Sequence, residues 1–268
     1  SNATGPMRRF ARARPRHAAT PSMLLVSAAV LGLVALTSFI SGIFGVAGGL
    51  ILMGALVYLL PVAQAMIVHG AAQFVSNASR SVLWRKYLVW DLIVKFTATS
   101  ALCLAMFWFV RFVPSKTLVL FLLGSSTVAL FFVPAWLAPK ITQPGGAYLT
   151  GFLGTALILV AGVSGPFIDQ FFVRTDLDRR APVATKAAMQ CVSHVVKIVY
   201  FASFSGSALD EQWLGLLAVV PVVSILAATA ASRVVERMTD KQFYWWTRRI
   251  VLVLGCYYMI EATRSWFA

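Results

Sequence analysis

Charged residues are scarce in this chain. They make up 12% of its 268 residues, and only nine residues are Asp or Glu, whereas about a quarter of a typical soluble domain is charged. Hydrophobic residues account for 59%, so a water-soluble fold would have too little polar surface to cover itself. The composition therefore excludes an ordinary soluble domain and indicates a membrane protein.

Cysteine is almost as scarce, and motifs of catalysis are missing. Cys103, Cys191 and Cys256 stand alone in apolar segments, without the Cys-x-x-Cys or Cys/His spacing of metal sites. The sequence contains no His-Glu-x-x-His, Gly-x-Ser-x-Gly or phosphate-loop motif. We therefore expect no disulfide, no metal, no cofactor and no enzymatic activity, and direct use of ATP would need a partner.

The basic excess gives a formal net charge of +14. Residues 1–21 begin with Ser-Asn-Ala, typical of the scar that a removed purification tag leaves. A Pro-containing arm follows, with Arg8, Arg9, Arg12, Arg14 and Arg16. We interpret this arm as a disordered tail held on the inner side of a membrane, with no nucleic-acid partner because no folded domain accompanies it. The overall charge favours anionic lipid or an anionic solute as a partner.

Apolar segments of membrane-spanning length recur after residue 21. A helix of about 20 residues crosses the bilayer core and satisfies its own backbone polar groups. The segments run approximately over 22–60, 62–84, 88–113, 117–138, 145–173, 182–204, 213–234 and 247–268. The sequence thus predicts an all-α polytopic membrane protein with about eight transmembrane helices, embedded in lipid.

Two of these segments are interrupted. A continuous helix over 22–60 would be about 58 Å long, so it must break, and small residues mark the place: Ser41, Gly42, Gly45, Gly48 and Gly49. The fifth segment has a counterpart in Gly162-Val163-Ser164-Gly165-Pro166, followed by Asp169. Broken helices are therefore expected at matching places in the two halves of the chain.

A second similarity follows each break. The stretch 73–80, Gln-Phe-Val-Ser-Asn-Ala-Ser-Arg, aligns without gaps on 190–197, Gln-Cys-Val-Ser-His-Val-Val-Lys, and four residues earlier His69 pairs with Lys186. This alignment predicts two pseudo-symmetric repeats, 22–138 and 139–268. The distribution of basic loops leaves open whether the repeats are inverted or parallel.

Each aligned stretch places a polar stripe on one face of an otherwise apolar helix. Polar groups in lipid are costly, so the stripes face protein or a water-filled path. Simple hydrogen bonding between packed helices is the structural alternative. Interrupted helices at matching points of two repeats are typical of a transporter's binding site. At such a site the amide and hydroxyl groups, the cations and the free N–H groups of the breaks would hold an anion. The candidate substrate-binding residues are Ser41, Gly42, Gly45, Gly48, Gly49, Gln73, Ser76, Asn77, Arg80, Ser164, Gly165, Gln190, Ser193, His194 and Lys197.

Three further residues are candidates for proton coupling or charge pairing, namely His69, Asp169 and Lys186. Asp169 would carry a coupling proton or pair with a nearby cation. Lys197 lies deep in its segment, so we expect an anionic substrate or Asp169 to offset its charge. Arg80 is close to Trp84 and could instead extend to the membrane surface, which makes Lys197 the stronger substrate candidate. Gln73 and Gln190 are expected to approach each other near the membrane midplane.

The pattern Ser41-Gly42-x-x-Gly45-x-x-Gly48-Gly49, with a degenerate Gly162-x-x-Gly165 in the second half, resembles the TauE/SafE sulfite exporter family. The similarity covers the chain after residue 22. It implies a multi-pass permease of the bacterial inner membrane that moves sulfite, organosulfonates or related sulfur oxyanions. The chain departs from the family at Pro166-Phe-Ile-Asp169, where a second Gly-Gly run is usual.

The sequence predicts a secondary transporter for a small sulfur-containing anion. Two alternatives remain: a passive anion channel along the same path, and a membrane partner subunit that transports nothing. The sequence does not determine the coupling ion, the direction of transport or the oligomeric state, and it leaves open whether the protein forms a homo-oligomer.

Overall fold

The computed structural model describes residues 21–44, 46–134, 137, 139–173, 175–178, 180–204, 211–235 and 239–267. Residues 1–20 of the predicted arm, which was expected to end at residue 21, and Gly45 lie outside the described residues. The described residues contain no strand. They form α1 (Pro21–Phe44), α2 (Val46–Leu59), α3 (Val62–Leu83), the 3-10 turn η1 (Arg85–Tyr87), α4 (Trp90–Val110), α5 (Lys116–Phe132), α6 (Gly146–Ala161), α7 (Gly165–Phe172), α8 (Arg180–Phe204), α9 (Glu211–Val235) and α10 (Asp240–Phe267).

The predicted all-α polytopic class is confirmed, and the helices follow the apolar segments closely. Six segments each form one helix, and the two interrupted segments each form two, α1 with α2 and α6 with α7. Four helices are long and apolar enough to cross a membrane: Leu24–Phe44, Trp90–Val110, Arg180–Phe204 and Trp213–Ala231. Helix α3 is of similar length but carries the polar stripe, which lowers its hydropathy.

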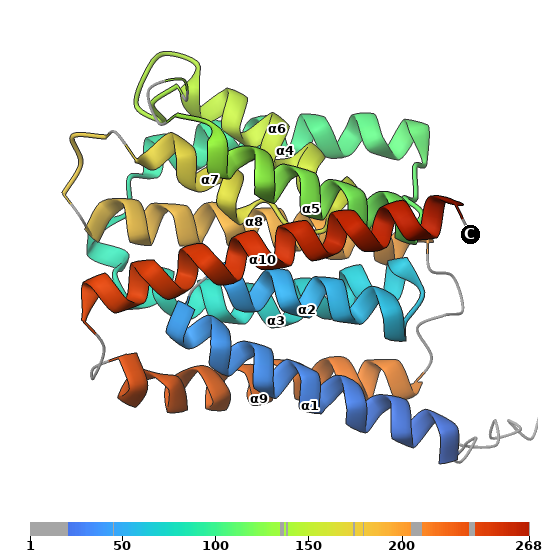
Figure 1. Ribbon diagram of the computed structural model, residues 1–268. Helices are drawn as coiled ribbons and strands as arrows, with labels where there is room; N and C mark the ends of the chain where they lie inside the picture. The colour runs from blue at the N-terminus through green and yellow to red at the C-terminus, as the bar shows by residue number, and fades with distance from the viewer. Residues whose placement is uncertain are drawn as a thin grey trace, which may run out of the picture.

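At the first break the chain folds back on itself. A Cβ on Gly48 would lie 2.3 Å from the carbonyl oxygen of Thr37, although eleven residues of straight helix span about 16 Å. Helix α2 therefore returns along α1, as Figure 1 shows. Any side chain at Gly48 would push the two helices apart.

The second break lies between α6 and α7. Gly162 ends α6 with a φ of 80°, and its N–H bonds to the carbonyl of Ile158. This left-handed conformation favours glycine. Ser164 precedes α7, and Pro166 stands in its first turn, where the missing N–H of proline costs no helical hydrogen bond.

Helices α3 and α8 pack against each other in the middle of the bundle (Figure 1). The other large interfaces join α1 with α9, α4 with α6, and α5 with α10. The repeat prediction implies that α1 and α2 correspond to α6 and α7, and that α3, α4 and α5 correspond to α8, α9 and α10. Under this correspondence the α1–α9 interface is the counterpart of the α4–α6 interface, and the α3–α8 and α5–α10 interfaces each join a helix to its own counterpart. The division into two repeats stays a prediction, and this packing supports it.

The outer helices carry the surface suited to lipid. Phe109 of α4 and Leu226 of α9 are among the large apolar side chains exposed there. Around the centre, Met53, Met66 and Phe201 belong to one buried apolar cluster, and Phe96 and Ile168 belong to another. The polar stripes of α3 and α8 are largely buried within the bundle, as expected of polar groups that avoid lipid.

Candidate functional site: a polar pocket between the two helix breaks

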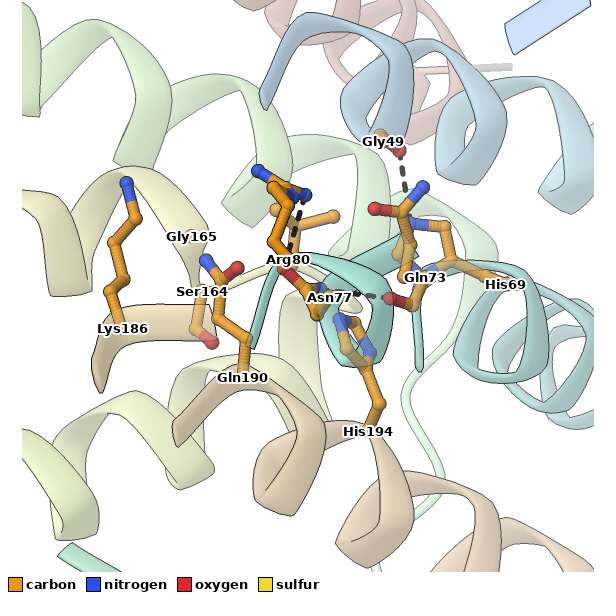
Figure 2. Close-up of a pocket in the computed structure, with 11 residues that line it drawn as sticks. Gly49, His69, Gln73, Asn77, Arg80, Ser164, Gly165, Lys186, Gln190 and His194 are labelled. Carbon is orange, nitrogen blue, oxygen red and sulfur yellow. Dashed lines mark hydrogen bonds between the residues drawn. The ribbon is translucent and has the colours of Figure 1, made fainter. Parts of the chain in front are cut away.

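A pocket lies where the two breaks meet α3 and α8 (Figure 2). Its volume is about 40 Å³, and a single water needs roughly 10–15 Å³ on the same measure. It therefore has room for a solute of a few heavy atoms. The lining residues are Gly49, His69, Gln73, Asn77, Arg80, Val163, Ser164, Gly165, Lys186, Gln190 and His194.

The two polar stripes face each other across this pocket. Gln190 and His194 point from α8 toward the side chains of α3, as Figure 2 shows. Gln73 and Gln190 line the same pocket, and both are buried. Both glutamines therefore face the interior of the bundle rather than lipid.

Arg80 belongs to the pocket wall, and its guanidinium bonds back to the preceding turn of α3. Its Nε donates to the carbonyl of Ser76 at 3.3 Å, and its Nη2 donates to Asn77 Oδ1 at 3.1 Å and to Ser76 Oγ at 3.4 Å. Asn77 is itself held, because its Nδ2 donates to the carbonyl of Gln73 at 2.9 Å. Within the described residues these bonds engage Nε and Nη2, and Nη1 makes no hydrogen bond.

Asp169 pairs with Lys186. Lys186 Nζ lies 2.7 Å from Asp169 Oδ1, and both side chains are partly exposed. Asp169 therefore pairs with Lys186, whereas the contacts of Lys197 Nζ are His69 and the carbonyl of Gly162. Lys186 lies one turn before Gln190 on α8 and close to α7, so it reaches Asp169, whereas Lys197 is eleven residues further along α8.

Lys197 lies behind the pocket and does not line it. Its side chain is fully buried, and its Nζ donates to the carbonyl of Gly162 at 2.9 Å and contacts His69 Nδ1 at 2.7 Å. His69 Nε2 lies 3.0 Å from the carbonyl of Gly49. Arg80 thus borders the pocket, whereas Lys197, the stronger substrate candidate by sequence, contacts the backbone carbonyl of the second break.

Two side chains of the wall have polar atoms without a partner. Within the part of the chain that the structure describes, Ser164 Oγ and His194 Nδ1 make no hydrogen bond, and their residues are only 2% and 6% exposed. Leaving a buried polar group unpaired costs about 1–3 kcal/mol. Both residues line the pocket, so these atoms are placed to bind a polar solute.

The charge of the wall is that of an anion site. Arg80 and Lys186 contribute positive charge, that of Lys186 is paired with Asp169 outside the wall, and none of the described lining residues is Asp or Glu. Gly165 lies at the N-terminus of α7 and Gly49 in the first turn of α2, and helix N-termini present free N–H groups and positive partial charge. Among the described residues no cluster of His, Cys, Asp and Glu could hold a metal ion.

Some predicted residues lie elsewhere and serve helix packing. A Cβ on Gly42 would lie 2.5 Å from Ala231 Cβ of α9, so Gly42 allows α1 and α9 to approach. Ser193 Oγ donates to the carbonyl of Met189 at 3.2 Å within α8. The predicted residues that do not line the pocket are Ser41, Gly42, Gly48, Ser76, Ser193, Lys197 and Asp169. Val163 does line it, and an apolar residue in an apolar segment carries no sequence signal of that role.

A family model described as sulfite exporter TauE/SafE matches residues 29–258. The chain belongs to the TauE/SafE family. This confirms the resemblance carried by the Gly-rich segment. For a TauE/SafE protein the family implies a membrane transporter of sulfur anions rather than an enzyme, which agrees with the cationic pocket. Searches of curated proteins and of solved structures found no match to the chain.

Proposed function

We propose that this TauE/SafE protein is a secondary active permease of the bacterial inner membrane that carries sulfite, a small organosulfonate or a related sulfur oxyanion. The observation that carries the proposal is the cationic pocket, in which Ser164 Oγ and His194 Nδ1 are buried without hydrogen-bond partners among the described residues. The family supports the class of solute.

The chemistry of the wall suits a sulfur oxyanion. Sulfite and the sulfonate head each present three oxygen atoms that accept hydrogen bonds. The Arg80 guanidinium supplies charge-assisted donors, Ser164 supplies a hydroxyl, and Gln73 and Gln190 supply amide N–H groups. The volume of about 40 Å³ favours a four-atom anion such as sulfite, or a sulfonate with a short organic group.

The position of the pocket favours a carrier. Its wall comes from both halves of the chain, with Gly49 and α3 on one side and Ser164 and α8 on the other. Discontinuous helices that meet at a repeat interface are typical of carriers in which one half moves against the other around a fixed site.

Flux in proteoliposomes tests the proposal. The purified protein is reconstituted with equal sulfite on both sides, and a pH gradient is imposed while the membrane potential is held at zero with potassium and valinomycin. A secondary carrier accumulates sulfite against its own gradient with saturable kinetics. A channel would pass sulfite only downhill, and a partner subunit would give neither flux nor sulfite binding, so either result would contradict the proposal.

A further inference from the structure

A buried chain of hydrogen bonds joins the two helix breaks. It runs from the carbonyl of Gly162 to Lys197 Nζ, at 2.9 Å, then to His69 Nδ1, at 2.7 Å, and from His69 Nε2 to the carbonyl of Gly49, at 3.0 Å. Both side chains are almost completely buried. The chain thus connects the backbone of one break with that of the other, next to the pocket that His69 lines.

The geometry limits how many protons this pair holds. A carbonyl oxygen only accepts, so His69 Nε2 must carry hydrogen, and in a neutral imidazole Nδ1 then accepts from Lys197. Protonating both groups would place an Nδ1–H against an ammonium group, with two donors and two positive charges in contact. Lys197 and His69 therefore share at most one excess proton and titrate as a unit.

We propose that Lys197 and His69 form a proton site and that anion binding in the pocket is coupled to proton uptake by this pair. The proposal rests on the proposed function and names its coupling ion. The proton comes from solvent and joins Lys197 Nζ or His69 Nδ1, and the pair then carries one positive charge beside the bound anion.

The charges around the pair determine whether anion binding favours or opposes proton uptake. His194 on α8 faces His69, with their ring centroids 5.8 Å apart, and Arg80 on α3 and the Lys186–Asp169 ion pair of α8 and α7 lie further along the same pocket. Apart from Asp169 these groups are basic, so a proton on the pair is repelled until an anion offsets their charge. Because linkage is reciprocal, the proton then strengthens anion binding by the same factor.

Calorimetry with methanesulfonate as the probe tests the coupling, because this anion keeps its charge from about pH 5 to about pH 10 and sulfite does not. Titrations are run in pairs of buffers with different ionisation enthalpies, which reveals how many protons are taken up. We expect uptake approaching one proton per anion at the alkaline end. Affinity should fall by up to about tenfold per pH unit over that range.

Two variants test whether Lys197 is responsible for the proton uptake. Lys197→Met should abolish both the uptake and the pH dependence. His194→Gln, which changes the other buried histidine of the pocket, should weaken binding at every pH but keep the uptake. If the wild type binds the anion without proton uptake at any pH, the inference is overturned and the proposed function stays intact. Proton uptake that persists in folded Lys197→Met protein would have the same consequence. The wild-type result decides the inference even if the variant does not fold. No binding of methanesulfonate or sulfite at all would refute both.

Discussion

Replacing Arg80 with glutamine removes one positive charge from the pocket wall and keeps a polar side chain there. A unit charge about 4 Å from an anion contributes about 4 kcal/mol at an effective dielectric constant of about 20. Arg80 is only partly buried, and glutamine still donates a hydrogen bond, so the loss falls toward the value of a charge-assisted hydrogen bond, about 1.5–3 kcal/mol. Sulfite should therefore bind roughly 10-fold to 150-fold more weakly.

Isothermal titration calorimetry of the detergent-purified protein measures this loss. Arg264→Gln is the matched control, because Arg264 has an exposed side chain and pairs with Glu261 on α10, outside the pocket lining. Arg80→Lys should give an intermediate affinity, since lysine keeps the charge without the forked geometry. Sulfite affinity in folded Arg80→Gln protein equal to that of the Arg264→Gln control would refute the assignment of Arg80 to the site.

Three further changes test other parts of the structure. Gly162→Ala should lower the free energy of unfolding by at least about 1–2 kcal/mol, because alanine is strained at a φ of 80° and its Cβ would meet Met53 Sδ at 2.6 Å; a thermal unfolding midpoint equal to that of the wild type would contradict this. Asp169→Asn should tighten sulfite binding several-fold, since it frees the charge of Lys186 beside the pocket; weaker binding in the same titration would show that Asp169 acts otherwise. Gly42→Ala should lower the unfolding midpoint because its Cβ would collide with Ala231, and the sulfite affinity of the folded protein should not change if Gly42 only serves packing.

The helices and breaks could be predicted from the sequence because their causes are local. Apolar length sets each segment, and an over-long run with clustered glycines must break, as the chain does between Phe44 and Val46. The stripes of α3 and α8 were predictable because polar residues at helical spacing share one face, and lipid disfavours them.

The roles of individual residues were harder to predict because they depend on which element lies opposite. Gly42 and Gly49 share one motif, yet Gly42 packs against α9 and Gly49 borders the pocket. Proximity of Arg80 to Trp84 in sequence suggested an interfacial side chain, but hydrogen bonds to Ser76 and Asn77 hold it along α3. Only the packing of α8 against α3 and the second break directs Lys197 to the carbonyl of Gly162 and to His69 instead of to the pocket.

The central claim is that a sulfur oxyanion binds between the two helix breaks. Selenite is similar to sulfite in shape and charge. Because selenium scatters X-rays anomalously, a crystal of the protein with bound selenite locates the anion directly. We predict an anomalous peak within hydrogen-bonding reach of Arg80, Ser164 and His194. A peak at another place, in protein that transports selenite and sulfite in competition, would contradict the account.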